Sequence, residues 1–164
     1  MIRGQRARDR AISGPHEPID PDLPSPQGAS PRGPFNFANL TLVGVGGALG
    51  TLARYACSLT WPTASGTFPT TILLVNLSGA FLIGLTLSVL VRIGRTGGPR
   101  LFSCIGVLGG WTTMSTASVS ADLLIAHGHA LAGLGYLALS LCGGAIATSS
   151  SIALAHHVVK VEGA

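Results

Sequence analysis

Charged residues are almost absent from most of this 164-residue chain. Between Gly33 and Val159, full charges occur only at Arg54, Arg92, Arg95, Arg100 and Asp122. Each of the four charge-free stretches between them can hold the ~20 apolar residues that cross a hydrocarbon core of about 30 Å. An amphipathic helix of a water-soluble domain would carry charge along its outer face. The pattern therefore predicts an all-α membrane protein with four transmembrane helices.

The residues that flank the apolar stretches place these four spans. The first is predicted over about residues 37–60, before a Trp-Pro pair, and the second over about 69–91, beginning at a proline suited to a helix start. The third is predicted over about 100–126, with an interruption near Gly110, and the fourth over about 130–158. Together they predict a membrane domain over residues 37–160.

Residues 1–36 differ from the rest of the chain. They are rich in Pro, Gly, Arg and Asp and contain no apolar run. They cannot bury a core and are predicted to be disordered. They also lack the apolar region of a signal peptide. The segment is either a tail or the product of a start codon placed too far upstream, and we assign it no role.

The basic residues near the span ends lie on one side. Arg32 precedes the first span, three arginines lie between the second and third, and Lys160 follows the fourth, whereas the other two loops contain no Lys or Arg. Cytoplasmic loops carry an excess of Lys and Arg. The sequence thus predicts one fixed orientation in the cell membrane, with both termini in the cytoplasm.

The predicted third span contains an unusual segment, residues 109–116, with the sequence GGWTTMST. Hydrocarbon offers no water to unpaired backbone groups, so a spanning helix is interrupted only where it lines a cavity or holds an ion. Released carbonyls suit a cation such as Na⁺, whereas the hydroxyls could meet an anion. The segment predicts a membrane transport protein and leaves both kinds of ion open.

Four polar residues on the other spans are candidates for ion contact. Arg54 either anchors the first span at the interface or contacts an ion. Asn76 offers a neutral amide donor suited to an anion, or an interhelical hydrogen bond. Tyr136 and Ser140 are four residues apart and form a hydroxyl track on one helix face. Because no carboxylate lies within spans one, two or four, passive conduction is favoured over proton-coupled export.

Three motifs in chain order carry a family resemblance. Residues 46–55 (GGALGTLARY) are similar to GGxxGxxxRY, 75–84 (VNLSGAFLIG) to VNxxGxFxxG, and 106–118 (GVLGGWTTMSTAS) to GxxGGxTTFSTFS. The set resembles the Fluc (CrcB) fluoride channels from about residue 38 onward. The resemblance implies an antiparallel dimer of four-helix subunits that passes fluoride down its gradient.

The resemblance also implies roles for individual residues. A structural Na⁺ would be held by the backbone carbonyls of Gly109 and Thr112, and Arg54 would lie in or near a vestibule. The residues assigned to the fluoride pathway are Arg54, Asn76, Met114, Ser115, Thr116, Ala117, Tyr136 and Ser140.

Met114 and Ala117 depart from the family pattern, which has phenylalanine at both positions. The edge of an aromatic ring is electropositive and can face a partly dehydrated anion. A thioether and a methyl group cannot replace it. We therefore expect a homodimer to conduct poorly. Together with the charge bias, this predicts pairing with an oppositely oriented homologous subunit that supplies the missing rings.

Other function classes remain as alternatives. The chain could be a non-conducting scaffold subunit that stabilises a fluoride-channel partner. A small multidrug exporter is disfavoured because such proteins resemble this one in size but rely on a glutamate in the first span. An enzyme is disfavoured because there are no paired carboxylates and no His/Cys cluster with metal-ligand spacing. The expected partners are fluoride, the lipid bilayer and a second subunit, and no nucleic acid is expected.

Overall fold

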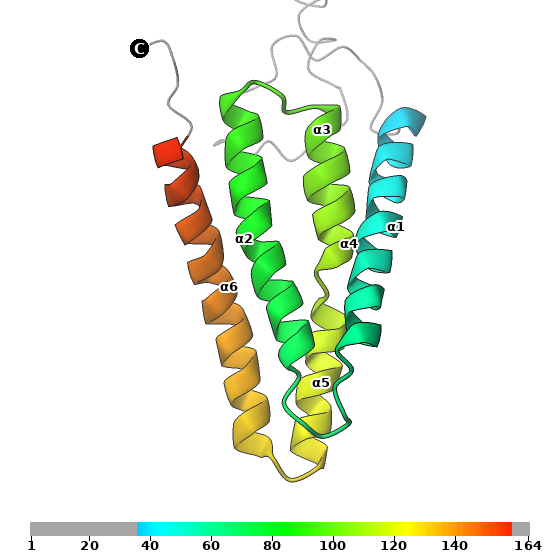
Figure 1. Ribbon diagram of the computed structural model, residues 1–164, viewed down its shortest axis with the longest axis vertical. Helices are drawn as coiled ribbons and strands as arrows, with labels where there is room; N and C mark the ends of the chain where they lie inside the picture. Colours follow the sequence, from blue (N-terminus) through cyan, green and yellow to red (C-terminus); the bar gives the residue numbers. More distant parts are fainter. Residues whose placement is uncertain (1–35, 159–164) are drawn as a thin grey trace, which may run out of the picture. The chain divides into compact units, whose positions relative to one another are not determined.

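The computed structural model describes residues 36–158, and the regular elements in that range are all helices (Figure 1). Three of them, α1 (Phe37–Thr60), α2 (Thr70–Arg92) and α6 (Ala130–Val158), are long and apolar enough to cross a membrane. Their bounds agree with the predicted first, second and fourth spans to within one residue. The predicted disordered tail lies outside the described residues apart from Asn36, as do the last two residues of the predicted membrane domain.

The predicted third span is a broken helical segment built from four pieces. These are α3 (Gly98–Arg100), the π-helical η2 (Leu101–Leu108), α4 (Gly109–Trp111) and α5 (Met114–Ala126). Between α4 and α5 the two residues Thr112 and Thr113 adopt extended backbone conformations, with ψ angles of 154° and 119°. Figure 1 shows the ribbon leaving the helix here and resuming as α5. The interruption thus lies two residues beyond the predicted Gly110.

Local contacts fix where several of these helices begin and turn. The Asn36 side chain accepts a hydrogen bond from the Ala38 N–H at 3.1 Å and caps α1. The Thr113 hydroxyl accepts the Thr116 N–H at 3.2 Å and caps α5 in the same way. Gly128 has a φ of 84°, a conformation that permits the tight turn from α5 into α6.

Glycines allow the helices to pack closely in two pairs, α1 against η2 and α4, and α2 against α6. A Cβ atom on Gly50 would lie 1.9 Å from the Val107 carbonyl oxygen, and one on Gly84 would lie 2.2 Å from Ser151 Oγ. Close backbone approach at small residues is the usual means by which membrane helices pack. In Figure 1, α1 lies beside α3 and α4, and α6 beside α2.

Large apolar side chains remain exposed along these helices. Leu131 is 86% exposed, Ile146 66% and Leu74 65%. The buried cluster is small and joins α2, α5 and α6 through Ile72, Leu73, Ala117, Ala121, Leu124 and Tyr136. Extended apolar surfaces mark faces that contact a membrane or another protein. The described residues therefore form a thin helical layer whose outer faces are suited to lipid or to a second subunit.

Candidate functional site

The break between α4 and α5 is held by a side chain of α2. Asn76 Nδ2 donates to the Thr113 carbonyl oxygen at 3.0 Å, and the Thr113 N–H donates to Asn76 Oδ1 at 2.8 Å. The carboxamide thus satisfies both backbone groups of Thr113, which a regular helix would have paired internally. Unpaired backbone groups are costly away from water, so Asn76 makes the interruption stable.

Side chains of α1 reach the other side of the break. Arg54 Nε donates to the Gly110 carbonyl oxygen at 3.3 Å, and Thr51 Oγ1 donates to the same oxygen at 3.4 Å. The last carbonyls of a helix carry partial negative charge, which a guanidinium at that end stabilises. Arg54 therefore caps the end of α4, a contact between residues 56 positions apart in the chain.

Within residues 36–158, three carbonyl oxygens at the break have no hydrogen-bond donor, those of Gly109, Trp111 and Thr112. In a continuous helix the Gly109 oxygen would accept the Thr113 N–H, but that N–H is bonded to Asn76. Within residues 36–158, no hydrogen bond reaches the carbonyl oxygen of Gly109 or Thr112. The described residues also contain no group of three His, Cys, Asp or Glu side chains able to hold a metal. Unwound backbone carbonyls and helix C-terminal ends coordinate Na⁺ in membrane transporters, and the two predicted ligands, Gly109 and Thr112, are among the carbonyls at the break that are open to a cation.

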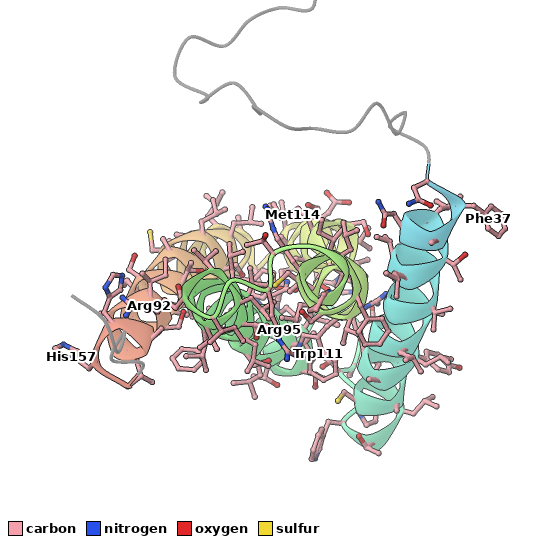
Figure 2. The ribbon with its side chains drawn as sticks, turned by 90° about the horizontal axis from the view of Figure 1, so that it is seen from above. Phe37, Arg92, Arg95, Trp111, Met114 and His157 are labelled. Atoms are coloured by element: carbon pink, nitrogen blue, oxygen red, sulfur yellow. The ribbon has the colours of Figure 1, made fainter. Side chains whose placement is uncertain are left out.

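A groove of about 330 Å³ runs along α2, the break, α5 and α6, and we call it the break groove. It brings together four of the predicted fluoride-pathway residues, namely Asn76, Met114, Ala117 and Ser140. Met114 is 61% exposed, whereas Ala117 is buried at 1%. Figure 2 shows Met114 and Trp111, three residues apart, on opposite sides of the helical layer.

The polar groups of the break groove are mostly committed to the protein itself. The hydroxyls of Thr112, Ser140 and Thr148 donate to the carbonyls of Leu108, Tyr136 and Ala80, and that of Thr113 donates to Thr116 Oγ1. The Asn76 Nδ2 group carries two N–H donors and uses one on Thr113. Among the groove's side chains within residues 36–158, the second N–H of Asn76 is thus a donor without a hydrogen-bond partner.

Tyr136 does not line the break groove, although it precedes Ser140 by one helical turn. Its side chain is fully buried in the cluster that contains Ala117, and its ring meets that of Phe68 edge-on, with centroids 5.6 Å apart. Its hydroxyl has no hydrogen-bond partner within the part of the chain that the structure describes. The Tyr136 side chain thus lies in the buried cluster and Ser140 lines the groove, while the Ser140 hydroxyl donates to the Tyr136 carbonyl oxygen at 2.8 Å.

Thr116 lines a second cavity, of about 290 Å³, formed by α5, the end of α1 and the loop before α2. We call it the loop pocket. Ser58 and Ser120 also line it, and Ser58 Oγ donates to the Arg54 carbonyl. Because the Thr113 hydroxyl bonds to both Thr116 Oγ1, at 3.1 Å, and Ser115 Oγ, at 3.2 Å, it links the break groove to the loop pocket.

Sequence reasoning missed two contacts that shape the site. It did not identify Thr113 as the partner of Asn76 or the Gly110 carbonyl as the partner of Arg54. The sequence signal was an amide and a charged side chain on apolar helices, because each such group needs a hydrogen-bond partner. The partners are backbone atoms, however, and residue types do not reveal which backbone atoms they are.

Comparison with known proteins connects this geometry to a family. Residues 41–152 match the family model described as CrcB-like protein, Camphor Resistance (CrcB). The chain is 44% identical over 116 residues to the fluoride-specific ion channel FluC 3 of Streptomyces avermitilis, covering 70% of this chain and 57% of that protein. It is 38% identical over 123 residues to the fluoride-specific ion channel FluC of Rhizobium meliloti, covering 74% of this chain and 98% of that protein. The match thus spans a little over half of the first relative and nearly all of the second, and the chain belongs to the CrcB-like family.

Proposed function

We propose that this chain is a subunit of a passive fluoride channel in the cell membrane. The broken segment crosses the membrane as a third span between α2 and α6, making four crossings in all, and both termini lie in the cytoplasm. The relatives are named as ion channels and not as enzymes, which supports transport. The observation that carries the proposal is the Asn76–Thr113 pairing, which keeps a helix open beside a groove where an amide N–H can meet an anion.

A structural Na⁺ at the break belongs to the same proposal. The carbonyl oxygens of Gly109 and Thr112 would hold it, and their lack of hydrogen-bond donors within the described chain supports this assignment. A bound cation would offset the partial negative charge of these oxygens and hold α4 and α5 in fixed register. Arg54 supplies a permanent positive charge at the neighbouring Gly110 carbonyl.

The pore is completed by a partner. We infer an antiparallel pair in which the second subunit is a homologous chain of opposite orientation. The break groove contains neither a phenylalanine nor a spare hydroxyl, and the one-sided charge disfavours insertion of this chain in both orientations. Streptomyces avermitilis has channels numbered FluC 2 and FluC 3 that both match this chain, so an organism can hold several members of the family.

A non-conducting scaffold subunit is the second candidate function. It is favoured because the groove hydroxyls already donate hydrogen bonds within the protein and leave none for an ion. These are the hydroxyls of Thr112, Thr113, Ser140 and Thr148. In that case the chain would stabilise a conducting partner and contribute no pathway of its own.

Fluoride efflux from liposomes separates these functions. Liposomes that contain only this chain should release little fluoride, whereas the double variant Met114→Phe/Ala117→Phe should release it. The matched control Met114→Leu/Ala117→Val adds apolar bulk without a ring and should stay silent. Rapid efflux from the unaltered chain would contradict dependence on a partner. A folded double-Phe variant that stays silent would favour the scaffold.

A further inference from the structure

A third cavity, of about 430 Å³, lies between the last turns of α2 and α6, away from the break. We call it the end groove. The two helices touch closely at Gly84, where a Cβ atom would lie 2.2 Å from Ser151 Oγ. Beyond that contact a space opens, lined by Leu87, Ser88, Val91, Arg92 and His156. Its α2 wall borders the outer surface, since Val91 is 56% exposed.

The end groove combines an apolar wall with a basic rim. Leu87 and Val91 form the apolar part, and Arg92 Nη2 is hydrogen-bonded to His156 Nδ1 across the two helices. Arginine has donors only, so His156 Nδ1 accepts and its ring carries the proton on Nε2. That contact leaves an imidazole N–H beside a half-buried guanidinium, a planar cation suited to phosphate oxygens. Figure 2 shows Arg92 beside the end of α6, where His157 points outward.

The charge around the end groove is positive. Arg92 ends α2, and Arg95 and Arg100 follow within the next eight residues. The one acidic residue between positions 36 and 158 is Asp122, and it lies on α5, at the opposite end of the helical layer (Figure 1). The end groove therefore has one arginine, Arg92, in its lining, and the two further arginines lie close in sequence but outside that lining.

We propose that the end groove binds an anionic phospholipid, with the headgroup phosphate at Arg92 and His156 and an acyl chain along Leu87 and Val91. Basic pockets between membrane helices bind anionic headgroups in this manner. The apolar wall favours a lipid over free phosphate, because only a lipid covers both parts of the groove. This site is independent of the fluoride pathway.

Native mass spectrometry of the full chain in detergent tests the proposal. The protein is titrated with phosphatidylglycerol or with phosphatidylcholine of the same acyl chains. The unaltered chain should retain phosphatidylglycerol preferentially. Arg92→Gln should weaken that retention about fivefold, the effect of one basic residue near an anionic membrane surface. Arg95→Gln is the matched control, since it removes the same charge three residues away outside the groove and should change retention little.

A second variant keeps the test decisive if Arg92→Gln does not fold. Ser88→Phe places a ring in the end groove without changing any charge, and it should also weaken retention of phosphatidylglycerol. Equal losses of phosphatidylglycerol retention in the Arg92 and Arg95 variants would overturn the proposal, because they would indicate a diffuse attraction between the lipid and the basic residues. It would also be overturned by equal retention of the two lipids, by full retention in Ser88→Phe, or by displacement of the lipid by equimolar inorganic phosphate.

Discussion

The contact between α1 and η2 allows a sharp test of the packing that supports the break. In Gly50→Ala the new Cβ would lie 1.9 Å from the Val107 carbonyl oxygen, roughly 1.5 Å short of the 3.4 Å at which ordinary van der Waals contact begins. The obstacle is backbone and cannot rotate away, so the two helices must separate. Overpacking of this kind costs about 1–3 kcal/mol. Separation also weakens the bond from Arg54 to Gly110, so we expect a total loss of about 2–4 kcal/mol.

Gly44→Ala is the matched control, because it lies on the same helix and a Cβ there would have no neighbour within 4 Å. It should leave stability unchanged or raise it by up to about 1 kcal/mol through helix propensity. Reversible unfolding in mixed micelles with rising dodecyl sulfate gives both free energies of unfolding. A Gly50→Ala value within about 0.5 kcal/mol of the control would refute the close approach of α1 and η2.

Three further predictions concern the break and the topology. Asn76→Ala should lower the free energy of unfolding in the same assay by about 1–3 kcal/mol, because two backbone groups of Thr113 lose their partner; no loss would show that the break is held otherwise. Replacing K⁺ in the buffer by Na⁺ should raise the melting temperature, because a Na⁺ concentration of a hundred times its Kd stabilises the folded state by about 2.7 kcal/mol. Equal melting temperatures in the two ions would count against the Na⁺ site. A reporter fused to the carboxyl end should be found in the cytoplasm alone, and equal signals from both sides of the membrane would contradict the fixed orientation.

The long helices were predictable because their signal is local. Few charges interrupt residues 37–158, and the ends of α1 and α6 coincide with turn residues and polar flanks. The position of the break was less accessible. The sequence suggested an interruption near Gly110, yet Gly110 lies within α4 and Gly109 keeps helical backbone angles, with φ −65° and ψ −34°. The backbone leaves the helix at Thr112 and Thr113 because Asn76, 37 residues away from Thr113, pairs with its backbone.

The sequence suggested the candidate site residues but did not determine their geometry. Helical spacing places Tyr136 and Ser140 on one side of α6, yet packing against Phe68 draws the tyrosine into the core and leaves the serine at the groove. Arg54 was equally consistent with a membrane anchor, because its contact with the Gly110 carbonyl depends on how closely α1 packs against η2. Such details are set by neighbouring helices, and residue type alone does not specify them.

The proposed dependence on a partner is tested most directly by fluoride efflux after co-reconstitution. Liposomes would contain this chain, a family member of opposite charge bias with both phenylalanines, or the two together, with each protein in the mixture at the amount used when it is alone. We predict that the mixture releases fluoride faster than the sum of the separate samples and that Asn76→Ala in this chain lowers the excess. Efflux of the mixture equal to that sum, with both proteins folded, would contradict a shared pore.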